Sequence, residues 1–398
     1  MSLIPPAETP GPKPLPTNVK LLGLASLLND TASEMLAPLM PDFLMTVLGG
    51  KEWQLGWIDG VGDSIASLLK LWSGAKSDHL GRRKSFVVAG YTVAALARPF
   101  IGLAAVPWHL FALRGIDRVG KGIRSAPRDA MIAEVSDETN RGRNFGFHRA
   151  MDHLGAAIGP LCAFIFLWFY PGGIRVLFLL TLIPAIPIVV LLAWGLREKQ
   201  KAAAAEGATP LALHGFDRNF WIYLAALLVF TLGNSSDSFL LVRAKELGIP
   251  LVFHPILWIV FHIVKGGGNL ITGKWVDRIG PRPLIWAGWL LYAATYLAFG
   301  LATSAWQVWG LFLLYGVFYA LTEPAEKALV AALVGSDRKG LAFGWFNLTL
   351  GVGALPASVG FGWVYSAYGP LAAFSMGATF SLVAAVLLAC VRMTPAKA

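Results

Sequence analysis

Apolar stretches of about 20 residues recur along the whole chain and are separated by short polar segments. A helix needs about 20 mostly apolar residues to cross a hydrocarbon core of about 30 Å, so each stretch predicts a membrane-spanning helix. Twelve such stretches occur, at 19–47, 53–73, 85–106, 108–133, 144–170, 174–196, 219–242, 251–273, 283–303, 306–334, 340–366 and 370–392. The pattern predicts an all-α membrane protein with twelve transmembrane helices.

Composition agrees with this pattern, because 56% of the 398 residues are hydrophobic and only 14% are charged. Ordinary soluble domains carry about 25% charged residues, so a soluble globular enzyme is excluded. The net charge of +10 does not indicate a nucleic-acid partner, since the basic residues punctuate apolar segments instead of clustering on one polar face. Cys162 and Cys390 lie in hydrophobic stretches without metal-binding spacing and are expected to be packing residues.

Positive charge in the short loops predicts the orientation, because Lys and Arg are retained on the cytoplasmic side. One set of loops is rich in basic residues, among them Arg82, Arg83, Arg141, Arg197, Arg278 and Arg338. The other set holds only Lys51, Arg175, Arg243 and Lys245. Both termini are therefore expected in the cytoplasm of a multi-pass protein of the cell inner (plasma) membrane.

The longest polar interruption divides six predicted helices from six. The expected organisation is a disordered cytoplasmic tail at 1–18, a six-helix bundle at 19–196, a cytoplasmic linker at 197–218 and a second bundle at 219–392. The halves also match in sequence, since the pattern of the segment 74–83 is repeated 199 residues later in 273–282. Such a repeat is typical of secondary transporters whose site lies between the halves.

The repeated segment carries a loop motif, with Gly74, Asp78, Gly81, Arg82 and Arg83 in the first copy and Asp277 and Arg278 in the second. On these residues the chain resembles the major facilitator superfamily, with His79 departing from the usual basic position. The resemblance implies two pseudo-symmetric six-helix bundles and a conformational latch formed by the motif.

The fourth predicted helix carries a charged stripe. At about 100° per residue its ionisable residues fall within an arc of about 120°, and they are Arg114, Asp117, Arg118, Lys121, Arg124 and Arg128. Charges inside a membrane span must face a cavity or a partner. Three explanations stay open at this point: an anion site, a network of internal salt bridges with facing carboxylates, and a mixture that includes a cation site.

Carboxylates suited to either role occur on the first two helices, where Asp30 pairs with Glu34 and Asp59 with Asp63 at a spacing of four residues. These four are the candidates for proton coupling, because a carboxyl group in the membrane can load and release a proton as access alternates. The alternative is that they are structural partners of the stripe.

Two further elements complete the expected site. Gly155, Gly159 and Pro160 resemble the antiporter signature of the superfamily's fifth helix, although two terminal glycines are absent, and this favours export. A polar wall facing the stripe is expected from helices seven and ten, with the residues Asn234, Asp237, Tyr315 and Tyr319. With Arg114, Arg118, Lys121 and Arg124 these form the expected substrate site.

The sequence therefore predicts a proton-coupled exporter of a small organic anion or amphiphile. A divalent-metal or cationic-drug exporter of the same fold is the alternative, and a polytopic membrane enzyme is disfavoured because no catalytic motif occurs. The expected partners are a small-molecule substrate, protons and the lipid bilayer, without nucleic acid. We expect a monomer with no cofactor, no catalytic residue and no resident metal.

Overall fold

The computed structural model describes residues 14–136, 141–198, 216–334 and 339–391, and the regular secondary structure in these ranges is helical throughout. Most of the predicted tail at 1–18 and of the linker at 197–218 lies outside the described residues, as does the side chain of Asp78.

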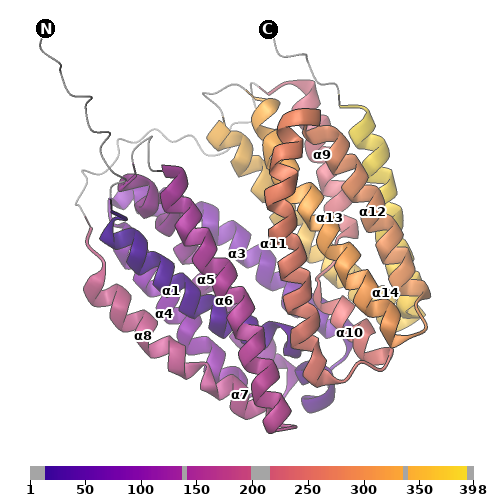
Figure 1. Ribbon diagram of the computed structural model, residues 1–398, viewed down its shortest axis with the longest axis horizontal. Helices are drawn as coiled ribbons and strands as arrows, with labels where there is room; N and C mark the ends of the chain where they lie inside the picture. The colour runs from indigo at the N-terminus through magenta and orange to yellow at the C-terminus, as the bar shows by residue number, and fades with distance from the viewer. Residues whose placement is uncertain (1–13, 137–140, 199–215, 335–338, 392–398) are drawn as a thin grey trace, which may run out of the picture.

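The first half of the chain forms the bundle drawn in indigo to magenta in Figure 1. Its elements are α1 (Thr17–Leu36), η1 (Ala37–Leu39), α2 (Met40–Asp42), η2 (Phe43–Val47), α3 (Glu52–Leu80), α4 (Arg83–Ile101), α5 (Pro107–Glu134), α6 (Arg141–Phe169), α7 (Ile174–Leu180) and α8 (Leu182–Gly195).

The second half forms the bundle drawn in orange to yellow. Its elements are α9 (Arg218–Gly233), α10 (Ser238–Glu246), η3 (Leu251–Phe253), α11 (His254–Ile279), α12 (Pro281–Leu301), α13 (Ala305–Ala332) and α14 (Lys339–Ala389). The start of α1 and the end of α14 lie at the same end of the molecule (Figure 1).

By length and composition, seven helices of the described chain could cross a membrane, and all of them follow residue 142. The last of these is two spans, because Gly369 at φ 84° breaks α14 in front of Pro370. The helices α1, α3, α4 and α5 complete the predicted set of twelve; they fall outside the apolar group because they carry the intramembrane charges. The twelve-helix prediction is confirmed.

The two bundles repeat the same packing. In the first, α1 packs on α6, α4 on α5, and α3 on α5. In the second, the corresponding neighbours are α9 with α14, α12 with α13, and α11 with α13. The bundles meet along α3 with α14 and along α6 with α11, which is also a symmetric pair of contacts. The internal sequence repeat thus corresponds to a structural repeat.

Contacts between the bundles gather at the end of the molecule remote from the chain termini. There Lys245 of α10 forms an ion pair with the buried Asp42 of α2 and also contacts Thr46. At the same end, Ser366 of α14 contacts the start of α3, donating to Glu52 over 2.9 Å and accepting from the Trp53 amide over 3.2 Å.

The chain that leaves the first bundle is held at its opposite end. The Asn18 amide donates to the Arg197 carbonyl over 2.6 Å and accepts from the Arg197 amide over 3.2 Å. The next residue, Glu198, accepts from the backbone amides of Arg83 and Lys84 at the start of α4. The first two residues of the predicted linker are therefore held against the first bundle.

Candidate functional site

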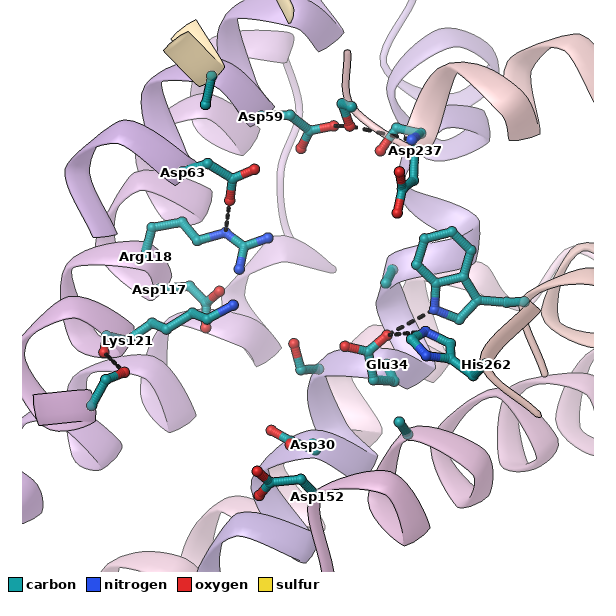
Figure 2. Close-up of a pocket in the computed structure, with 18 of the residues that line it drawn as sticks. Asp30, Glu34, Asp59, Asp63, Asp117, Arg118, Lys121, Asp152, Asp237 and His262 are labelled. Carbon is teal, nitrogen blue, oxygen red and sulfur yellow. Dashed lines mark hydrogen bonds and ion pairs between the residues drawn. The ribbon is translucent and has the colours of Figure 1, made fainter. Parts of the chain in front are cut away.

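A cavity of about 560 Å³ lies between the two bundles and is lined by residues of both (Figure 2). Its lining contains equal numbers of acidic and basic side chains. The acids are Asp30, Glu34, Asp59, Asp63, Asp117, Asp152, Asp237 and Glu323, and the bases are Arg98, Arg114, Arg118, Lys121, Arg124, Arg128, Arg149 and Lys265. Few apolar side chains join them, so the cavity is a polar compartment inside the membrane span.

The charged stripe of α5 forms one wall of this cavity, and part of the stripe is paired with carboxylates. Asp117 accepts from Arg98 Nε over 2.8 Å, and Arg114 Nη1 lies 3.4 Å from the other carboxylate oxygen. Further along, Arg118 Nε lies 3.6 Å from Asp63 Oδ1 of α3. The Arg98–Asp117 and Arg118–Asp63 pairs join α5 to its neighbours α4 and α3, and the Arg114–Asp117 pair lies within α5.

Arg128 at the end of the stripe pairs with Asp129 over 2.9 Å, whereas Lys121 and Arg124 have no carboxylate partner in the described chain. Arg124 is only 5% exposed, and its guanidinium lies 4.5 Å from the centre of the Tyr91 ring, yet its Nε and Nη1 atoms have no hydrogen-bond partner. The Lys121 side chain extends into the cavity beside Arg118, and among the described residues no acid lies within ion-pair distance of it (Figure 2). The stripe thus combines paired structural charges with two cations that are free to meet a ligand.

The α1 carboxylates face different neighbours. Glu34 accepts from Trp258 Nε1 over 2.8 Å and lies 3.9 Å from His262 Nε2, which joins α1 to α11 of the other bundle. Asp30 accepts from the Asn29 amide over 2.8 Å and has no cation within ion-pair distance in the described chain. It lies near Asp152 in the lower part of Figure 2.

The wall contributed by the second bundle is built around a helix break. The sequence predicted one helix over 219–242, but the structure ends α9 at Gly233 and begins α10 at Ser238. Asn, Ser and Asp side chains compete for local backbone hydrogen bonds, which explains the interruption. Here Ser236 Oγ accepts from the Ser238 amide over 3.2 Å.

Hydroxyl groups hold the two acids at this break. Asp237 accepts from Tyr315 over 2.6 Å and from Tyr319 over 3.3 Å. Asp59 of α3 accepts from Ser236 over 2.7 Å. Tyr315 is 1% exposed and reaches the site only through Asp237, whereas Tyr319 lines the cavity itself.

Arg98, Trp258 and Lys265 are among the lining residues that had no role in the sequence analysis. The ring of Tyr319 lies 4.2 Å from Lys265 Nζ, which also pairs with Glu323 over 3.5 Å. A signal for Arg98 and Lys265 exists, because each is a charge within a predicted membrane span. Nothing in the sequence distinguishes Trp258 from the other tryptophans.

Metal ligation has no support in the described chain, where no three His, Cys, Asp or Glu side chains come together in a way that could hold a metal ion.

The loop motif lies at the ends of helices, away from the cavity. A Cβ on Gly74 would lie 3.2 Å from the Ala126 side chain, so α3 approaches α5 closely there. Gly81 and Gly280 both adopt positive φ, at 62° and 81°, which shows that the turn is repeated in the two halves. Arg82 directly precedes α4 as its N-cap residue.

The charged residues of the motif differ between the copies. Arg83 Nη1 pairs with Glu134 of α5 over 3.2 Å, so the first copy joins two helices of one bundle. Asp277 and Arg278 of the second copy are exposed at the end of α11.

The glycines of α6 make the tightest approach to α1. A Cβ on Gly155 would lie 2.5 Å from the Leu27 carbonyl oxygen, and one on Gly159 would lie 2.4 Å from the Thr31 carbonyl oxygen. Such distances leave no space for any side chain, so these glycines set the α1–α6 contact. Pro160 follows them inside α6.

Comparison with known proteins agrees with this geometry. The sequence profile of the Major Facilitator Superfamily matches residues 22–264 and 244–398. The chain is 29% identical over 380 residues to an uncharacterized MFS-type transporter of Methanocaldococcus jannaschii, with 94% of each chain covered. It is 23% identical over 338 residues to the multidrug resistance protein MdtH of Escherichia coli, with 78% of this chain and 79% of that one covered.

Among solved structures, the fold is similar to a bacterial homologue of the human lysosomal transporter Spinster in its inward-facing, unoccupied conformation. The TM-score is 0.74 at 18% identity, with 95% of this chain and 98% of that one covered.

Proposed function

The chain belongs to the major facilitator superfamily, and from this premise we propose that it is a proton-coupled exporter of a small, hydrophilic organic anion. Membership makes it a multi-pass membrane transporter and not an enzyme. The proposal adds to this the sign of the substrate's charge, the coupling ion and the direction of transport.

The observation that carries the proposal is the pair of cations without carboxylate partners, Lys121 and Arg124, in the polar cavity. A buried guanidinium with unused N–H groups is costly unless an acceptor fills the place. Carboxylate and phosphate groups supply such acceptors, and arginine matches their planar geometry. The sparse apolar lining favours a hydrophilic anion over the amphiphile that the sequence left open.

Proton coupling is assigned to Asp30 and Glu34. Both line the cavity that holds the free cations, and neither has Lys or Arg within ion-pair distance in the described chain. A protonated Asp30 leaves Arg124 available to a substrate anion, whereas an ionised Asp30 competes with that anion for the same positive charge. Loading of a proton and of substrate are thereby linked.

The direction of transport rests on two resemblances. The small-residue motif at Gly155 and Gly159 is similar to an antiporter signature, and relatives named MdtH are multidrug resistance proteins. Both favour efflux.

The test is transport into proteoliposomes under an imposed pH gradient, with a panel of small carboxylates and phosphate esters and an enclosed pH-sensitive dye. Uphill movement of at least one anion with opposite proton flux is expected. Asp30→Asn or Glu34→Gln should abolish the uphill component, while exchange of anion for anion survives in at least one of them. The control is Glu246→Gln, because Glu246 is an exposed acid remote from the cavity. Normal concentration of the anion by both variants would refute the coupling assignment.

A further inference from the structure

The helix break between α9 and α10 gathers oxygen atoms that have no cation. Asp59 and Asp237 accept hydrogen bonds only from hydroxyl groups, and in the described chain no Lys, Arg or His lies within ion-pair distance of either. The Oδ1 atom of Asn234 is buried there without any hydrogen-bond donor. An interrupted membrane helix is where transporters of this type place ligand groups, because the freed backbone and side chains face the cavity.

Across the cavity, α5 carries cations that have no anionic partner. Arg124 is at least nine-tenths buried and has two N–H groups without acceptors, and Lys121 has no acid within ion-pair distance. Figure 2 shows the separation directly: Arg118 and Lys121 project from one side, and Asp59 and Asp237 lie together at the top. Although the acidic and basic side chains of the lining are equal in number, the cavity has unpaired positive charge on α5 and unpaired negative charge at the α9–α10 break.

We infer that the substrate carries an ammonium group as well as its anionic group: the anionic group meets Lys121 and Arg124, and the ammonium group meets Asp59, Asp237 and Asn234. A ligand with a negative charge alone leaves the two carboxylates without a cation and Asn234 Oδ1 without a donor, and one with a positive charge alone leaves the buried guanidinium without an acceptor. Only a ligand carrying both charges satisfies the two ends at once. This inference rests on the proposed function and specifies its substrate class.

The cavity also sets the size and polarity of the ligand. Its volume of about 560 Å³ is within the range of sites for small organic molecules. Its lining is dominated by charges and hydroxyls, which suits a compact amino acid or aminophosphate more than an apolar cation.

The first test measures equilibrium binding to the purified full chain in detergent, by ligand-induced shifts in the thermal unfolding midpoint. The zwitterionic probes are 4-aminobutyrate and O-phosphoethanolamine. Each has two relatives that carry charge of one sign only: butyrate and butylamine for the first, ethyl phosphate and ethylamine for the second. At least one zwitterion is expected to bind with a Kd at least tenfold lower than that of both its relatives. Equal affinity for the anion alone, or no shift by any probe, would overturn the inference.

The second test separates the two ends. Asp237→Asn keeps an oxygen that accepts from the tyrosines, so folding is preserved while the charge is lost. It should raise the Kd of the zwitterion at least tenfold and leave that of the matching anion unchanged. Lys121→Gln should weaken the zwitterion and the anion but not the amine. Unchanged zwitterion affinity in Asp237→Asn would overturn the ammonium site.

Failure of this inference can be distinguished from failure of the proposed function. Proton-linked flux of a plain anion without preference for its zwitterion leaves the proposed function standing and removes the inference. Preferential zwitterion binding without any proton-linked flux supports the inferred substrate class and removes the proposed proton coupling.

Discussion

Arg98 and Asp117 form a buried ion pair between α4 and α5, with 2.8 Å between Nε and Oδ1 and both side chains at most 3% exposed. The other end of the same guanidinium donates to the carbonyl and side-chain oxygens of Asn29, over 3.0 Å and 2.9 Å. Three helices, α1, α4 and α5, are thereby joined through one arginine. This part of the charged stripe is a structural network.

Asp117→Asn should therefore destabilise the protein by about 3–5 kcal/mol, the usual cost of breaking a buried ion pair. Lys121→Gln should change stability by less than about 1 kcal/mol, because Lys121 has no acid that its loss would strand. Thermal unfolding followed by tryptophan fluorescence in detergent measures both. Equal destabilisation by the two variants would show that the whole stripe is structural, contrary to the proposed anion site.

Gly159 and Gly146 offer a matched pair on α6. A Cβ on Gly159 would collide with the Thr31 carbonyl, whereas nothing lies within 4 Å of one on Gly146. Gly159→Ala should cost about 1–3 kcal/mol through overpacking, while Gly146→Ala should be neutral or stabilise by up to about 1 kcal/mol through helix propensity. Comparison of the two unfolding midpoints tests this; a stable Gly159→Ala variant would contradict the tight α1–α6 contact.

The Lys245–Asp42 ion pair should stabilise the conformation that is closed at the end remote from the termini. Lys245→Ala is expected to increase labelling of an Ala354→Cys reporter by a membrane-impermeant maleimide added from that side. A contact worth about 1.4 kcal/mol changes the ratio of conformations about tenfold. The reporter cysteine is introduced into a variant in which Cys162 and Cys390 are replaced by serine, so that only the reporter reacts.

Lys51→Ala is the control for this experiment, since the Lys51 side chain forms no hydrogen bond or ion pair with the other bundle in the described chain. Unchanged labelling in Lys245→Ala would show that the ion pair does not hold this side closed.

The loop charges predict the orientation in the membrane, with residues 200–210 and both termini expected in the cytoplasm. Single cysteines introduced in that segment should react with an impermeant maleimide only after the membrane is opened. Labelling of intact cells at these positions would reverse the arrangement and with it the direction assigned to transport.

Much of the fold could be predicted from the sequence because it depends on apolar length and on an internal repeat. The helix break at Asn234 could not be predicted from the sequence. Short polar residues are compatible with both a continuous helix and an interruption, and packing decides between the two. The division of the stripe also escaped prediction. Whether Arg118 and Arg124 are paired depends on which acids face α5, and Asp63 reaches one of them but not the other.

Arg197 and Glu198 are held by hydrogen bonds to the first bundle, so this bundle does not need the peptide connection to the second bundle to hold its own C-terminal end. These contacts lie wholly within the segment that ends at Glu198, whereas the α3–α14 and α6–α11 interfaces join residues on the two sides of the connection. Two separately translated polypeptides, 1–198 and 199–398, should therefore assemble into a working transporter in the same membrane. Co-purification through a tag on one fragment, with anion flux retained, is the expected result; fragments that fail to associate would show that the peptide connection itself supplies needed binding energy.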